Sequence, residues 1–249
     1  MTAVVHGRGP GCEPSYPAEL LETLRVVVVA GLSVGILVIG LGSRLAMLLL
    51  RLTSPDSVIG VTSDDGFIIG RTSLSGTYNL VVVGAAVGLI GAVAYLVVAP
   101  WLIGPVWFRR FTVGVTAGAL GGSSLLHADG VDFTATGPLW FAVALFVVLP
   151  LATGVALALV TDAVAAPGSR TAHGRTRWAL PVLLLVLVPE ALVVLGPLAL
   201  VVAVLLVLRR LLLARIRSSR LATLGVRSAF LAVPVLSFVA LGQDLAELF

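Results

Sequence analysis

Long apolar runs separated by short polar segments dominate this chain. Runs of roughly 17–25 residues can cross a hydrocarbon core about 30 Å thick, so each predicts one membrane-spanning helix. The predicted spans are 24–42, 80–99, 111–126, 139–160, 180–208 and 228–241. The pattern therefore predicts an all-α fold, a polytopic transmembrane bundle of about six to seven helices. Residues 1–23 form a polar N-terminal tail, and residues 24–249 form a single transmembrane domain.

The apolar stretch 180–208 admits two interpretations. As one helix it would be roughly 44 Å long, which exceeds the thickness of the hydrocarbon core. Pro189 removes a backbone donor and favours a break beside Glu190, so we expect a hairpin broken at 189–190. In a single long span Glu190 would instead lie near mid-membrane, where an ionisable group suggests a proton or ion relay.

The segment between the first two spans predicts a small β-hairpin. Its arms are 58–62 and 67–71, which are rich in β-forming residues, and they flank Asp64, Asp65 and Gly66. Asp-Gly between two such runs is a strong signal for a hairpin turn. We expect this hairpin on the extracytoplasmic face.

Composition places the chain in lipid. Hydrophobic residues make up 59% of it and charged residues 11%, whereas a soluble domain carries about 25% charge. Its net charge of +4 comes from arginine without any lysine. Basic loops are typical of the cytoplasmic face of a membrane protein, and no soluble basic domain exists to bind nucleic acid. We expect a multi-pass protein of the cell (plasma) membrane.

Arginine placement predicts the orientation. Arg109 and Arg110 follow the second span, and Arg177 follows the fourth, which puts these loops inside. The N-terminus is then cytoplasmic and the C-terminus extracytoplasmic. Arg44, just past the first span, runs against this rule, and we interpret it as snorkelling at the outer headgroups.

Short motifs in the first half and the tail resemble a family of uncharacterised multi-span integral membrane proteins from GC-rich bacteria. The motifs are Gly42-Ser43-Arg44-Leu45-Ala46, Leu52-Thr53-Ser54-Pro55-Asp56, Val61-Thr62-Ser63-Asp64-Asp65-Gly66 and Asp244-Leu245-Ala246-Glu247-Leu248. The resemblance implies a multi-span architecture. It implies no mechanism, because the family has no assigned activity.

Small residues recur at four-residue spacing in the first three spans. In lipid, such positions let helix backbones approach closely. The glycines concerned are Gly31, Gly35, Gly84, Gly88, Gly114, Gly118 and Gly122. We expect them to pack helices within one chain, and self-association through one of these faces is the alternative.

The outer acidic loops hold the other candidate functional residues. These are Asp64 and Asp65 in the first loop and His127, Asp129 and Asp132 in the second. Their side chains are of a type that binds metal or substrate, but their spacing matches no compact ligand signature. We expect turn formation and solvation at headgroup level, with no metal and no cofactor.

No enzyme signature accompanies these residues. Ser123 and Ser124 near His127 lack an orienting acid and a strained elbow, so we expect no catalysis. The leading hypothesis is a non-catalytic accessory or scaffold protein that contacts lipids or partner membrane proteins. The alternative is a small transporter or permease component that uses Glu190.

Overall fold

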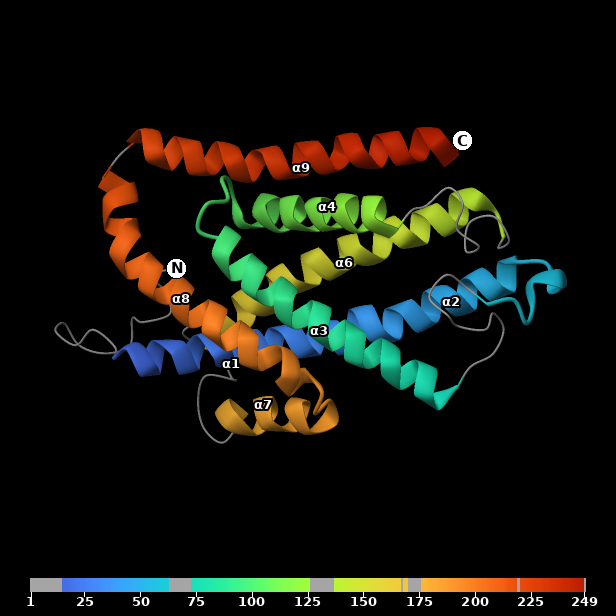
Figure 1. The fold of residues 1–249 in the computed structure, drawn as a ribbon, viewed down its shortest axis with the longest axis horizontal. Helices are drawn as coiled ribbons and strands as arrows, with labels where there is room; N and C mark the ends of the chain where they lie inside the picture. Colours follow the sequence, from blue (N-terminus) through green and yellow to red (C-terminus); the bar gives the residue numbers. More distant parts are fainter. Residues whose placement is uncertain are drawn as a thin grey trace.

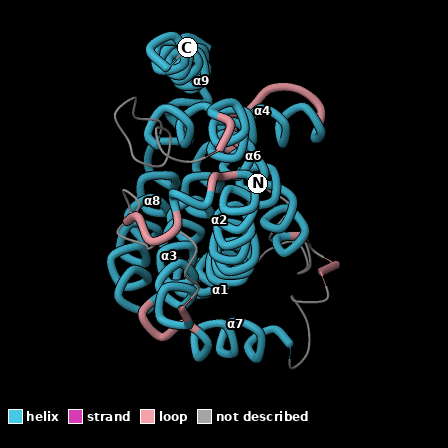
Figure 2. The backbone as a smooth tube through the Cα atoms, turned by 90° about the vertical axis from the view of Figure 1, so that its right-hand side faces the viewer, coloured by secondary structure: helices cyan, strands magenta, loops and turns pink. Residues whose placement is uncertain are grey.

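The computed structural model describes residues 15–62, 73–125, 137–166, 168–169, 176–218 and 220–248. Helices form nearly all of this part of the chain (Figures 1 and 2), and none of its residues lies in a β-strand. The helices are α1 (Tyr16–Val34), the π-helix η2 (Gly35–Leu41), α2 (Gly42–Thr53), the 3-10 helix η3 (Asp56–Val58), α3 (Leu74–Val98), α4 (Val106–Leu125), α6 (Leu139–Ala165), α7 (Thr176–Leu187), α8 (Ala191–Ser218) and α9 (Arg220–Leu248).

Four of these helical stretches are long and apolar enough to cross a membrane. They are Tyr16–Thr53, Leu74–Val98, Leu139–Ala165 and Ala191–Leu208. α4 is 20 residues long, but Arg109 and Arg110 in its first turn lower its hydropathy. Two other apolar helices, Arg177–Leu187 and Ala232–Gln243, are shorter than a span. The described helices thus support four spans, fewer than the six to seven that the apolar runs predict.

The first helix is longer than the predicted span 24–42 and includes part of the predicted tail. It begins at Tyr16 and runs without interruption through η2 into α2, which ends at Thr53. Arg44 therefore lies inside a helix, in the first turn of α2. Glycine disfavours a helix interior, but Gly40 packs so closely on α3 that an added Cβ would lie 3.0 Å from the Cα of Val81. Tertiary packing at this close approach holds the helix together.

The predicted β-hairpin is not supported where the structure describes it. Val58 is the last residue of the short helix η3 and not part of a strand. Pro55, with its φ of −61°, starts this helix, and its carbonyl accepts a hydrogen bond from the Val58 N–H at 3.2 Å. The predicted turn at 64–66 and the second arm lie outside the described residues.

The bundle is built around α1. In the most apolar 18 residues of Tyr16–Thr53, 67% are buried, whereas 17% are buried in Ala191–Leu208. α1 is therefore the central helix and α8 a peripheral one. Val27, Leu32, Ala85 and Leu89 are fully buried where α1 crosses α3. α4 packs on α6, and α9 lies along α4 at one edge, while α7 lies beside α1 at the opposite edge (Figures 1 and 2).

The stretch 180–208 is broken at the position where the sequence predicts a break. α7 ends at Leu187, a turn covers Pro189 and Glu190, and α8 begins at Ala191. Figure 1 shows α8 leaving this turn and crossing back over the bundle.

Candidate functional site

The polar side chains that join helices gather at the two ends of the bundle. One end contains the first turns of α1, α4 and α7 and the last turns of α3 and α6 (Figure 1). We call it the arginine end. The other end contains α2, the start of α3 and the turn before α8.

Asp162 on α6 is the centre of one cluster at the arginine end. Its Oδ1 accepts a hydrogen bond from the Tyr95 hydroxyl at 2.7 Å. Its Oδ2 accepts from Arg110, with distances of 3.1 Å to Nε and 3.0 Å to the Nη2 of that guanidinium. The carboxylate thus joins α3, α4 and α6. Both oxygens are occupied, so this acid is held as a helix tie rather than presented to a substrate.

The Tyr95 hydroxyl is the simplest group with which to test this tie. Tyr95 is 4% exposed, so a phenylalanine in its place keeps the packing and removes only the hydroxyl. We expect Tyr95→Phe to lower the free energy of unfolding by about 1.5–3 kcal/mol, the usual contribution of a hydrogen bond to a charged group. Thermal unfolding in mild detergent measures this loss. A variant as stable as the wild type would contradict the tie.

Glu22 on α1 is the centre of the second cluster. Its Oε1 accepts two hydrogen bonds from Arg25, whose side chain is only 1% exposed. Its Oε2 accepts from Arg177 on α7 at 3.1 Å. Arg25 also donates to the backbone carbonyl of Val164 on α6 at 3.3 Å. One carboxylate therefore serves two guanidinium groups and ties α1, α6 and α7 together.

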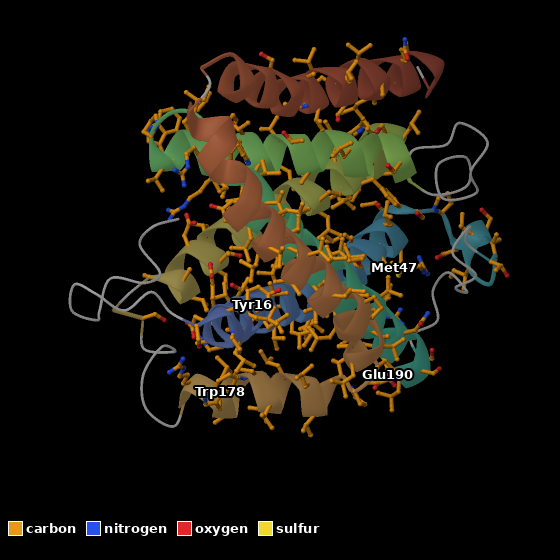
Figure 3. The ribbon with its side chains drawn as sticks, turned by 60° about the vertical axis from the view of Figure 1, so that its left-hand side comes forward. Tyr16, Met47, Trp178 and Glu190 are labelled. Atoms are coloured by element: carbon orange, nitrogen blue, oxygen red, sulfur yellow. The ribbon has the colours of Figure 1, made fainter. Side chains whose placement is uncertain are left out.

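Glu190 lies at the opposite end of the bundle, in the turn between α7 and α8 (Figure 3). It is exposed, and its Oε2 accepts a hydrogen bond from the Tyr78 hydroxyl at 2.7 Å. This bond stabilises the ionised carboxylate and lowers the pKa of Glu190 below its ordinary value of 4.5. Its position at a helix break, rather than inside a span, does not favour a relay across the membrane.

The lowered pKa gives the Tyr78–Glu190 bond a pH dependence. A carboxyl group with a depressed pKa contributes stability above its ordinary value of 4.5, and this contribution is lost as pH falls through the lowered pKa. We expect Tyr78→Phe to reduce thermal stability at pH 6 and to have a smaller effect at pH 3.

Tyr16→Phe is the control for this titration. The Tyr16 hydroxyl donates to the backbone carbonyl of Ala203 at 2.7 Å, and that acceptor does not titrate. The effect of Tyr16→Phe should therefore be the same at both pH values. A Tyr78→Phe effect that is equally independent of pH would contradict the bond to Glu190.

The other predicted site residues are not brought together by the described part of the chain. Asp64, Asp65, His127, Asp129 and Asp132 all lie outside the described residues. Arg44 on α2 donates to the backbone carbonyl of Ser73, just before α3, at 3.5 Å. Among the described residues, no group of three acidic, histidine or cysteine side chains is placed to hold a metal.

The predicted packing glycines lie at two helix crossings. Gly31 and Gly35 face Gly88 and Gly84 where α1 and η2 meet α3, with backbone against backbone. Gly114 and Gly118 on α4 face Leu151 on α6. Gly122 lies against Val147 of α6 and Leu241 of α9. All seven positions face a neighbouring helix of the same chain.

Sequence reasoning missed the residues at the centres of both clusters. Glu22 falls two residues before the predicted first span, and Asp162 two residues after the predicted fourth span. In each case the apolar pattern continues beyond the acid, and α6 extends to Ala165. An acid embedded in a continuing apolar run was the available signal, because such a group needs a partner.

Comparison with known proteins finds no family model, no curated protein and no solved structure that matches this chain.

Proposed function

We propose that this chain is a non-catalytic accessory or scaffold protein of the cell membrane, which contacts lipids and a partner membrane protein. The observation that carries this proposal is the use of its acidic side chains. Glu22, Asp56, Asp162 and Glu190 each accept a hydrogen bond from a basic or phenolic side chain of the same chain. Acidic side chains that bond to other side chains of the same chain support a structural role.

The outward surface supports contact with a partner. α9 packs on α4, where Leu241 lies against Gly122, and its Ser237 and Leu241 are buried. Its other side exposes Val235, Leu236, Phe238 and Val239, all of them apolar. A helix at the edge of the bundle with one packed face and one apolar face can meet lipid or a second membrane protein.

The experiment places a photo-reactive amino acid at Leu236, which is 67% exposed, and at Leu241, which is 8% exposed, as the matched control. We expect irradiation of cells to join one defined membrane protein to position 236 and none to position 241. Lipid adducts alone at position 236 would contradict a protein partner on α9.

The proposed orientation has the N-terminus in the cytoplasm and the C-terminus outside, which requires an odd number of crossings. The ends of the described chain support it, because α1 begins at the arginine end and α9 ends on the side of α2 (Figure 1). Positive charge at one end agrees with a cytoplasmic position for that end.

Reporter fusions test this orientation. We expect a C-terminal alkaline phosphatase to be active and a C-terminal fluorescent protein to be dark. A fusion at Ser54, which follows α2, should report the same side as the C-terminus. The reverse pattern at the C-terminus would show that the chain crosses an even number of times.

A small transporter or permease component that uses Glu190 is the alternative proposal. It predicts solute flux in liposomes that Glu190→Gln abolishes without a loss of protein. The exposed position of Glu190 beside Tyr78 favours the scaffold role over this alternative.

A further inference from the structure

The outward side of α7 combines a cation, an indole ring and a strip of apolar side chains. The side chain of Arg177 is 43% exposed, and its guanidinium carbon stands 5.7 Å from the centroid of the Trp178 ring. Trp178, Val182 and Val186 follow at four-residue intervals, so they share one face of the helix. They are 47%, 56% and 71% exposed.

The strip begins at a positive charge that faces outward. Glu22 is shared between Arg25 and Arg177. Arg25 is buried, whereas the side chain of Arg177 is 43% exposed, so Arg177 is the member of this cluster that presents its charge at the surface. Figure 3 shows Trp178 at the arginine end of α7, far from Glu190 at the other end.

We propose that this strip binds an anionic phospholipid. Arg177 holds the headgroup phosphate, because a guanidinium forms paired hydrogen bonds with phosphate oxygens. Trp178 lies at the level of the glycerol, where an amphipathic ring is favoured. One acyl chain lies along Val182 and Val186. The apolar strip favours a phospholipid over free phosphate, because free phosphate has no acyl chain to lie along it.

The site goes beyond the proposed scaffold role and does not depend on it. It requires only that α7 face lipid, and its test uses purified protein, so the partner experiment can fail while this one succeeds.

The test uses the fluorescence of Trp178 alone, after Trp101→Phe, Trp107→Phe and Trp140→Phe remove the other tryptophans. Brominated phosphatidylglycerol and brominated phosphatidylcholine are added in turn to vesicles that contain the protein. One arginine near an anionic surface contributes about 1 kcal/mol, so we expect phosphatidylglycerol to quench at about fivefold lower mole fraction. Added salt should reduce this preference.

Substitutions at two arginines test which residue causes the preference for phosphatidylglycerol. Arg177→Gln should abolish it, whereas Arg51→Gln should leave it unchanged, because Arg51 pairs with the exposed Asp56 at the other end of the bundle. Arg177→Lys keeps the charge but not the paired hydrogen bonds, so it should retain only part of the preference. If Arg177→Gln shows the same preference as the wild type, Arg177 does not select the lipid, and the proposal fails.

Two further outcomes would overturn the site. Equal quenching by both lipids in the wild type would show that the strip meets bulk lipid without selection. Competition by inorganic phosphate at concentrations comparable to the lipid would show a free-anion site instead of a phospholipid site.

Discussion

Gly88→Ala should destabilise the protein by about 2–4 kcal/mol, although alanine is the better helix former by about 1 kcal/mol. A Cβ at position 88 would fall on the carbonyl oxygen of Gly31 and 2.8 Å from the Cα of Gly35. These are backbone atoms of the central helix, so no side-chain rotation can make room. α1 and α3 would have to separate, and the dispersion contacts of Leu32 and Leu89 at the same crossing would weaken.

Gly242→Ala on α9 is the matched control, since a Cβ there meets nothing within 4 Å. It should be neutral or stabilising by up to about 1 kcal/mol. Thermal unfolding of both variants in the same detergent compares their stabilities. If Gly88→Ala were as stable as Gly242→Ala, the close approach of α1 and α3 would be wrong.

The long helices could be predicted from the sequence because each carries its own signal. An apolar run long enough to cross lipid must be helical, since every backbone group in it has to be paired internally. The break before α8 was predictable for a similar local reason, because Pro189 removes a donor and clashes with the preceding turn. These features depend on residues near one another in the chain.

The helix ends and the polar clusters could not be predicted in this way. The first helix continues past its glycines because Gly40 packs closely against Val81 of α3. No local sequence pattern reveals that contact. Arg110 and Asp162 are 52 residues apart, and Glu22 and Arg177 are 155 residues apart. Their pairing depends on which helices pack together. The sequence identifies the charges but not their partners.

The second large effect is expected at Glu22. Glu22→Gln keeps the size of the side chain and removes the charge that compensates Arg25, whose side chain is 1% exposed. Removing one member of a buried ion pair costs about 3–5 kcal/mol, because the remaining charge stays desolvated and loses its bonds to this carboxylate. Asp56→Asn is the matched control at the Arg51–Asp56 pair. Asp56 is 91% exposed, so its loss should cost about 0–1 kcal/mol.

A second substitution separates the buried charge from the lost hydrogen bonds. Arg25→Met in the Glu22→Gln background removes the buried guanidinium and replaces it with an apolar chain. We expect this double variant to recover most of the stability lost by Glu22→Gln, because apolar replacement of a buried ion pair is often neutral or stabilising. Arg177 loses its carboxylate in both variants, but its side chain is 43% exposed and can be hydrated. A double variant less stable than Glu22→Gln alone would mean that Arg25 stabilises the bundle chiefly through its bond to the Val164 carbonyl.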